Sequence, residues 1–246
     1  MNPIRPEIFH PYLNLIAAQS TREGGISPVP YDSLNLGNST NDNPENVDQN
    51  RHRFFSHLGY RLSQVALSRQ IHGSSILKVE MPGIYDGFDA LMTNQTGILI
   101  GVSIADCAPI LLHDPKKQVI AAVHAGWRGA KDKILSKTII ALHAQYGSNP
   151  ADILMFIGAC IGSEKFEVGE EVAEAFDPLF SRESKIQGKF LLDLKSALAK
   201  EAEENGVKRD KVEISTECTA SSPDRFFSHR KSGGITGRML AVIGLK

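Results

Sequence analysis

The chain of 246 residues carries 27 basic and 28 acidic side chains, so its charges nearly cancel. This balance excludes the strongly basic surface with which proteins attract nucleic acid or an anionic membrane, and we expect neither as a partner. Any preference for an anion must therefore come from local arginines. The three cysteines lie far apart and predict no disulfide framework, which is typical of a reducing compartment.

The first residues do not resemble a targeting segment. Two prolines and Glu7 interrupt the N-terminus before an apolar run develops, unlike a secretory signal. No stretch of the chain approaches the roughly 20 apolar residues that span a bilayer. We therefore expect a soluble, cytoplasmic protein.

The predicted elements begin after a segment rich in loops. Its polar run, residues 35–50, predicts either a flexible linker or an ordered loop beside a ligand. We favour the ordered loop, because Asn50 and Arg51 lead directly into the apolar Phe54 and Phe55.

Short β-like runs and helical patterns alternate after residue 63. Residues 63–70 alternate apolar and polar side chains, and two denser runs predict more buried strands at 97–104 and 118–124. A helical period follows Gly129 and ends at Gly147. The remaining runs predict a strand at 152–158, helices at 168–177 and 190–205, and closing strands at 211–215 and 238–245. Interleaved strands and helices indicate a mixed α/β or α+β fold, and without a repeat or linker we expect a single domain over residues 1–246.

Three local segments each carry one residue that binds soft or borderline metals. They surround His72, Cys107 and His124, which all lie at or just beyond the end of a strand-like run. One thiolate and two imidazoles form a ligand set for zinc and leave a fourth tetrahedral position for water or substrate. Such open coordination is typical of catalytic metal sites.

Each of these residues also has a plain structural interpretation. A histidine after a strand is more often a hydrogen-bonded structural residue than a ligand. A cysteine between apolar strands is usually a small buried hydrophobe. Spacing alone does not show that the three side chains meet in space.

A series of short segments extends from Thr21 to Arg238 and covers nearly the whole chain: TREGGIS, SLNLGN, QNR, QIHG, FDALMT, ADCAPILL, HAGWRG, IGACIG, FEVGEEV, ECT and FFSHRKSGGITGR. This series resembles, in order, the motifs of the YfiH-type family. That family was formerly labelled laccase-domain or polyphenol oxidase, and it is now described as purine nucleoside phosphorylase with adenosine deaminase activity. The most specific elements are ADC and HAGWRG. The sequence departs from the family pattern at Ala159 and His229.

The resemblance implies a single mixed α/β domain with layered β-sheets flanked by helices. It implies phosphorolysis of adenosine, inosine and S-methyl-5′-thioadenosine with inorganic phosphate, together with deamination of adenosine. The family's metal ligands correspond to His72, Cys107 and His124, which would hold zinc, with copper as an alternative metal.

The roles of other polar residues near these motifs stay open. Asp106 is a candidate to orient a ligating imidazole, to act as general acid or base, or to cap a turn. Phosphate requires a cationic site, which arginine suits through its planar fork of donors. The candidates are Arg22, Arg51, Arg128, Arg230 and Arg238, and the glycine-rich settings of Arg22 and Arg128 favour these two. Asn35 contacts the nucleoside or only stabilises its own loop.

The purine base also needs an apolar slot or an aromatic face. Trp127, Phe226 and Phe227 are candidates for this contact. Aromatic residues in such positions are core residues at least as often.

Three other functions compete with this interpretation. A multicopper laccase needs closely spaced pairs of histidines, and the eight histidines contain no His-x-His. A metal-free hydrolase or deamidase would use Cys107 as nucleophile with His124 or His72 as base. A non-catalytic zinc module predicts that Cys107→Ala lowers stability without removing any turnover.

Overall fold

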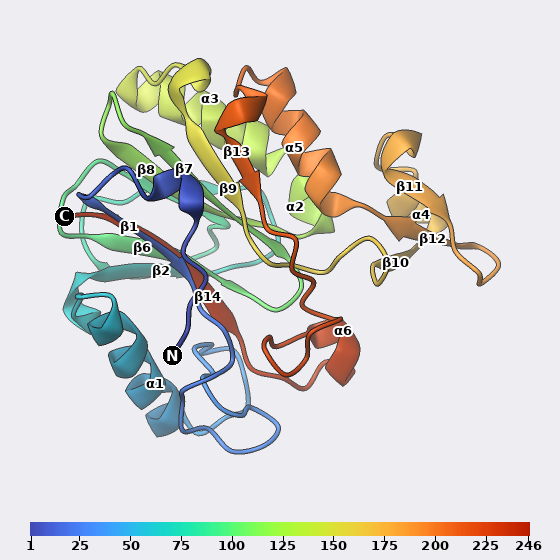
Figure 1. The fold of residues 1–246 in the computed structure, drawn as a ribbon, viewed down its shortest axis with the longest axis horizontal. Helices are drawn as coiled ribbons and strands as arrows, with labels where there is room; N and C mark the ends of the chain where they lie inside the picture. The colour runs from blue at the N-terminus through green and yellow to red at the C-terminus, as the bar shows by residue number, and fades with distance from the viewer.

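The computed structural model describes residues 1–246 as two large β-sheets packed face to face, with helices covering both outer sides (Figure 1). The first sheet is mixed and has five strands, in the order β1 (Leu15–Gln19), β14 (Met239–Leu245), β6 (Leu99–Ile104), β2 (Val65–Arg69) and β4 (Gly83–Asp86). The second has six, in the order β13 (Val212–Ile214), β9 (Leu154–Ile157), β7 (Ala108–Asp114), β8 (Val119–Ala125), β5 (Ala90–Thr93) and β3 (Ile76–Lys78).

A third, smaller sheet projects from the side of this sandwich (Figure 1). It is antiparallel and consists of β10 (Glu167–Gly169), β12 (Lys189–Leu192) and β11 (Ser181–Glu183). The helices are α1 (Pro44–His57), α2 (Trp127–Lys131), α3 (Ile134–Tyr146), α4 (Glu170–Ala173), α5 (Leu194–Glu204) and α6 (His229–Ser232). Short 3-10 helices occur at Glu7–Phe9, Leu62–Gln64, Pro150–Asp152, Pro178–Phe180 and Arg209–Lys211. The mixed α/β fold predicted from the sequence is confirmed.

The core has three layers because β8 and its neighbours are buried on both faces. In β8, Ile120 and Ala122 pack between the two large sheets, whereas Val119, Ala121 and Val123 pack against α3 and α5. This period of two explains the dense apolar run at 118–124, because a strand covered on both sides has no polar face. On the other side of the sandwich, α1 packs against the outer face of the first sheet.

The helix predicted after Gly129 is present, and two other predictions need correction. Helix α3 ends at Gly147, whose φ of 67° is the left-handed conformation expected of a C-terminal stop. The segment predicted as helix 190–205 is a strand up to Leu192, and its helix begins only after Asp193, whose side chain caps the Ser196 amide. The segment 168–177 is mostly not helical, because β10 occupies its start and α4 is a single turn.

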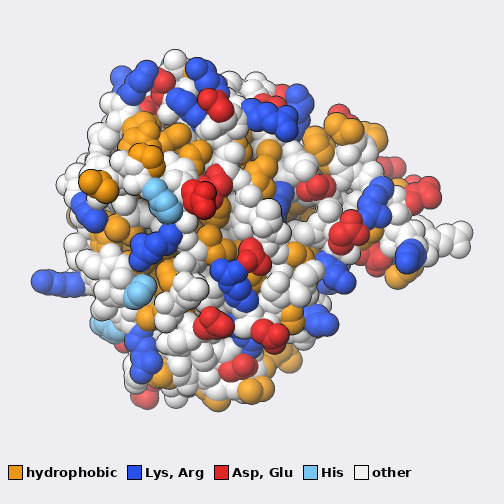
Figure 2. All heavy atoms as spheres, in the orientation of Figure 1, with side chains coloured by type: hydrophobic (Ala, Val, Ile, Leu, Met, Phe, Trp, Pro, Cys, Tyr) orange, Lys and Arg blue, Asp and Glu red, His pale blue; other side chains and the backbone are white.

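The polar run at 35–50 is ordered, and its C-terminal half is helical. Helix α1 begins within it, with Asn43 capping the Glu45 amide and Pro44 at the first helical position. None of the helices combines the length and the apolar character needed to cross a membrane. Figure 2 shows basic and acidic side chains interspersed over one face of the molecule, in keeping with the balanced net charge.

Candidate active site

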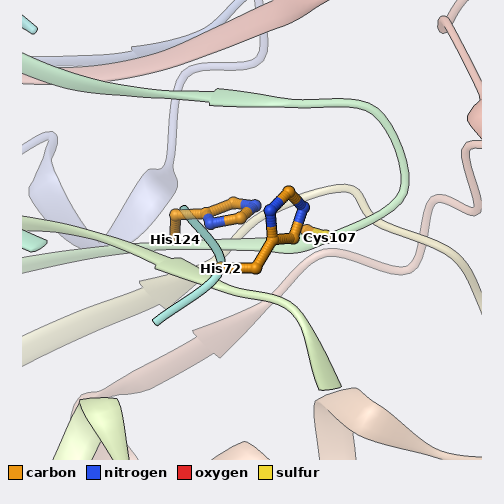
Figure 3. A group of neighbouring side chains, drawn as sticks. All are labelled: His72, Cys107 and His124. Atoms are coloured by element: carbon orange, nitrogen blue, oxygen red, sulfur yellow. The ribbon is translucent and has the colours of Figure 1, made fainter. Parts of the chain in front are cut away.

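The three predicted metal ligands meet at one end of the sandwich. His72 lies in the loop after β2, Cys107 in the turn between β6 and β7, and His124 near the end of β8. Their ligand atoms all lie within 4.8 Å of one another. The two imidazole rings meet edge to face, with centroids 4.9 Å apart, and the Cys107 side chain lies beside them (Figure 3).

Strand pairing explains why residues distant in sequence converge here. The antiparallel register of β7 and β8 pairs Pro109 with His124, which brings Cys107 to the His124 end of β8. The strand β5 pairs with the other edge of β8, and the His124 amide donates to the Asp89 carbonyl at 2.8 Å. His124 is therefore held between β7 on one side and the Asp89 backbone on the other.

Asp89, which the sequence analysis did not identify, connects the two histidines. Its carboxylate is fully buried and lies 2.8 Å from His124 Nδ1. The same carboxylate accepts hydrogen bonds from the backbone amides of His72 at 3.0 Å and Gly73 at 2.8 Å. Burial raises the pKa of Asp89, but the bonds from His124 and the backbone outweigh it and lower the pKa. With Nδ1 directed to Asp89, His124 presents Nε2 to the cluster.

The cluster favours the thiolate form of Cys107. Burial raises the pKa of the thiol, but His124 and His72 outweigh it and lower the pKa to about 6. Burial lowers the pKa of His124, whereas Cys107 and Asp89 raise it to about 9. Because thiolate is the form that binds metals and attacks electrophiles, the side chain is prepared for either chemistry.

Gly126 allows the site to close. It precedes α2, and a Cβ atom at this position would lie 3.0 Å from Cys107 Sγ and 3.5 Å from His72 Cδ2. A side chain would press into the cluster. This explains the glycine at the second position after His124.

Asp106 contacts neither imidazole. One of its oxygens accepts from Thr219 Oγ1 at 2.6 Å, and the other accepts from the Arg230 amide at 2.7 Å. Its backbone is left-handed, with φ of 88°. These two bonds anchor the C-terminal loop. Asp106 also lines the pocket beside the cluster, and its role as general acid or base stays a prediction. The carboxylate that holds an imidazole is Asp89 instead.

The cluster opens into a pocket of about 480 Å³ that is rich in arginine. Trp127 and Phe166 provide aromatic surface, and five arginines line the walls: Arg51, Arg69, Arg128, Arg230 and Arg238. Phe226 and Phe227 are fully buried core residues, so of the three predicted aromatic contacts only Trp127 reaches the pocket.

Two predicted substrate contacts, Arg22 and Asn35, do not line this pocket. Arg22 pairs with Asp32 at 3.0 Å and stacks on Phe227. Asn35 is fully buried, and its side-chain oxygen accepts from the Arg238 amide at 2.8 Å. The glycines next to Arg22 serve loop packing, since a Cβ at Gly25 would collide with the Ser33 backbone.

A family model described as "Multi-copper polyphenol oxidoreductase laccase" matches residues 16–246. The purine nucleoside phosphorylase of Deinococcus radiodurans is 37% identical over 245 residues, which cover 99% of this chain and 94% of the relative. The purine nucleoside phosphorylase YfiH of Escherichia coli is 37% identical over 234 residues, covering 93% of each chain. The chain belongs to the YfiH-type family. The resemblance inferred from its motifs is thereby confirmed.

Solved structures of YfiH-type proteins share the fold. The Bacillus licheniformis hypothetical protein YfiH superposes with a TM-score of 0.94 at 28% identity, covering 99% of this chain and 96% of that one. YlmD from Geobacillus stearothermophilus superposes with a TM-score of 0.92 at 32% identity, covering 96% and 94% of the two chains. The layered sheets are thus common to this chain and to both YfiH-type structures.

Proposed function

We propose that this protein is a purine nucleoside phosphorylase with adenosine deaminase activity, acting at a zinc site formed by His72, Cys107 and His124. The observation that carries the proposal is the convergence of these three side chains at an arginine-lined pocket. Its relatives bear the name purine nucleoside phosphorylase. The proposed substrates are adenosine, inosine and S-methyl-5′-thioadenosine.

The donor set fits a metal ion of borderline softness. Two imidazoles and one thiolate suit zinc, and copper is the alternative because it binds such ligands more tightly. Asp89 fixes the donor atom of His124 and the loop of His72, as carboxylates do around metal-binding histidines. A bound zinc would supply Lewis acidity and lower the pKa of water to about 7. A cluster of three ligands is smaller than a multicopper centre requires.

The other residues of the pocket would bind and orient the substrates. The arginines that form no ion pair, a group that excludes Arg69, provide positive charge for inorganic phosphate. Trp127 and Phe166 provide apolar surface for a purine. Arg128 stacks on Trp127 at 4.4 Å and Arg230 lies over Phe166 at 5.7 Å, so each aromatic ring of the pocket has a cation beside it. A nucleoside and an oxyanion can therefore be held side by side.

The test is chromatography of adenosine incubated with the purified protein, with and without phosphate, beside a chelator-treated sample. We expect adenine and ribose 1-phosphate only when phosphate is present, and inosine by deamination. Chelation should remove both activities, and added zinc should restore them. Absence of turnover by the metal-replete protein overturns the nucleoside assignment.

A metal-free cysteine hydrolase or deamidase is the second candidate, favoured by the low pKa of Cys107 beside His124. In this case Cys107 would attack an acyl or amide carbon and His124 would carry the proton. A nucleophilic thiol retains activity in chelator and loses it on alkylation. Hydrolysis of a chromogenic ester or amide that persists in chelator would support this function over the metal-dependent one.

A further inference from the structure

The five arginines of the pocket differ in whether their guanidinium groups already form ion pairs or hydrogen bonds within the protein. Arg69 is exposed and pairs with Asp86 at 2.7 Å. Arg230 donates from Nη1 to the Glu167 carbonyl at 2.8 Å. Arg238 donates from Nη1 to the carbonyls of Thr236 and Gly237. Arg128 is exposed and rests on Trp127, without a hydrogen bond to the protein.

Arg51 is the buried exception. It lies on α1 with only 7% of its surface exposed, and its Nε donates to the Leu36 carbonyl at 2.8 Å. Neither terminal nitrogen has a hydrogen-bond or ion-pair partner in the protein. These nitrogens are also not among the polar atoms sealed from solvent, and the residue lines the pocket, so they face open space. The pocket wall therefore presents two fixed nitrogen donors that have no partner in the protein.

No carboxylate forms an ion pair with Arg51. The charge of Asp48 favours the guanidinium, but from beyond ion-pair distance, and this carboxylate lies 3.7 Å from His52 Nε2. Burial lowers the pKa of Arg51 to about 10, so the guanidinium remains charged at neutral pH despite the cost. A buried charge without a partner is expensive, which favours a ligand as its missing partner.

A neighbouring pocket decides on which side of Arg51 the ligand lies. This second pocket, of about 540 Å³, shares Arg51, Asn38, Leu67 and Ile84 with the metal-site pocket. Its other walls carry two carboxylates, Asp42 and Asp48, which repel an anion. The metal-site pocket holds one carboxylate, Asp106, and three further arginines that form no ion pair: Arg128, Arg230 and Arg238. An anion on Arg51 therefore lies on the metal-site side.

We propose that Arg51 is the principal receptor for a tetrahedral oxyanion in this pocket, namely inorganic phosphate. Its planar fork offers two parallel donors to two phosphate oxygens, and its Nε bond to Leu36 holds that fork in place. As the phosphate contact for phosphorolysis, this role rests on the proposed function, whereas the binding of the anion does not. Arg51 is one of the five arginines that the sequence offered for this role, although their glycine-rich settings favoured Arg22 and Arg128.

The test compares Arg51→Met and Arg51→Lys with the wild type by calorimetric titration with inorganic phosphate and by steady-state kinetics. Loss of two charge-assisted bonds should weaken phosphate binding and raise its KM by roughly tenfold to hundredfold in Arg51→Met. The KM for adenosine should change much less. Arg51→Lys keeps the charge but not the fork, and should give an intermediate loss.

The matched control is Arg69→Met. This variant also removes one positive charge from the pocket, but the Arg69 side chain is exposed and already paired with Asp86. It should change phosphate binding by no more than about twofold. Thermal melting shows whether each variant folds. If Arg51→Met does not fold, the comparison of Arg51→Lys with the wild type decides the outcome. Unchanged phosphate affinity in a folded Arg51 variant, or an equal loss in Arg69→Met, overturns the proposal.

The titration separates this proposal from the proposed function. If no nucleoside is cleaved but phosphate binds and Arg51 variants lose it, only the function fails. Adenosine 5′-monophosphate provides a further arm, because the phosphate group of a nucleotide presents the same oxyanion. If this nucleotide binds much more tightly than adenosine through Arg51 while free phosphate does not bind, inorganic phosphate is the wrong ligand.

Discussion

Asp89 governs both histidines of the cluster with one carboxylate. It bonds to the ring of His124 and to the backbone that carries His72, so the loop and the strand are locked to each other. It is fully buried, and its negative charge is compensated by four hydrogen-bond donors: His124 Nδ1 and the amides of Ile71, His72 and Gly73. Metal affinity should therefore depend on Asp89 almost as on a ligand.

We expect Asp89→Asn to lower zinc affinity by roughly tenfold to hundredfold. The amide keeps the shape of the side chain but removes the negative charge. One carboxylate oxygen, which accepts hydrogen bonds, is replaced by an NH₂ group, which cannot accept them. Competition with a chromophoric chelator measures the affinity. Asp86→Asn, an exposed carboxylate on the neighbouring strand β4, is the control. Equal affinities in the two variants would show that Asp89 does not position the ligands.

His113 makes the stability of the second sheet sensitive to acid. It is fully buried in β7, its Nδ1 lies 3.2 Å from the Val119 carbonyl, and Tyr12 packs edge-on against its ring. Burial lowers its pKa below the ordinary value of 6.5. The unfolded chain therefore binds more protons as the pH falls through 6.5, and the folded state loses stability.

His113→Phe should flatten this pH dependence. Denaturant unfolding between about pH 7.5 and about pH 5 measures the free energy of unfolding in both proteins. The wild type should lose more stability than the variant over this interval, even if the variant is less stable at the upper end through loss of the Val119 bond. His10→Phe, at an exposed position, should retain the wild-type slope. Parallel curves for His113→Phe and the wild type would contradict the assignment.

Helix α1 is held to the N-terminal loops mainly through one buried side chain. Asn50 is fully buried, and its amide donates to Ser27 Oγ and to the carbonyls of Ser33 and Asn35, while its oxygen accepts from the Ile26 amide. The next residue along the helix is Arg51. The loops and the proposed oxyanion receptor are therefore fixed together.

Asn50→Ala should lower the free energy of unfolding by about 2–4 kcal/mol, because buried backbone groups lose their partners. Phosphate binding should also weaken, since Arg51 then sits on a looser helix. Gln49→Ala, on the exposed side of the same helix, should change stability by no more than about 0.5 kcal/mol. Chemical unfolding of both variants provides the comparison, and equal losses would mean that Asn50 does not anchor the loops.

The elements that the sequence predicted well are those whose pattern is set locally. The apolar period and Gly147 define α3, and the dense apolar run defines β8. Helix α1 was missed because its polar face and the preceding asparagines resemble a loop, although Asn43 and Pro44 are a helix-start signal. Strand β12 was merged with α5 because Leu191 fits the stripe of the helix that follows, and only its pairing with β10 and β11 reveals a strand.

The residues of the site also differ in how far the sequence alone predicts them. Cys107 and the two histidines are residue types that bind metals, so their motifs indicate a site. Asp89 also stands in a motif, FDALMT, but a carboxylate before a buried strand does not by itself indicate a role. Its role arises from the pairing of β5 with β8. The use of each arginine likewise depends on carbonyls and acids distant in sequence, so the chain order could not rank Arg22 against Arg51.

At the scale of the whole molecule, the hydrophobic core is extensive, and the His72, Cys107 and His124 cluster lies at one end of it. The three main core clusters contain 29, 17 and 12 buried hydrophobic residues. The two sheets and their helices therefore bury enough apolar surface to fold without a metal. On this ground we expect the proposed metal to serve catalysis and not folding.

Removal of the metal should accordingly abolish turnover while leaving the protein folded. Zinc at about 100 times its Kd raises the free energy of unfolding by about 2.7 kcal/mol. Chelation should therefore lower the Tm by about 5–10 °C. Far-ultraviolet circular dichroism should not change, and Cys107→Ser should behave as the chelated wild type. Unfolding on chelation would indicate a structural zinc module. Full turnover in chelator with a dead Cys107→Ser variant would indicate a cysteine nucleophile, because a thiol needs His124 but no metal.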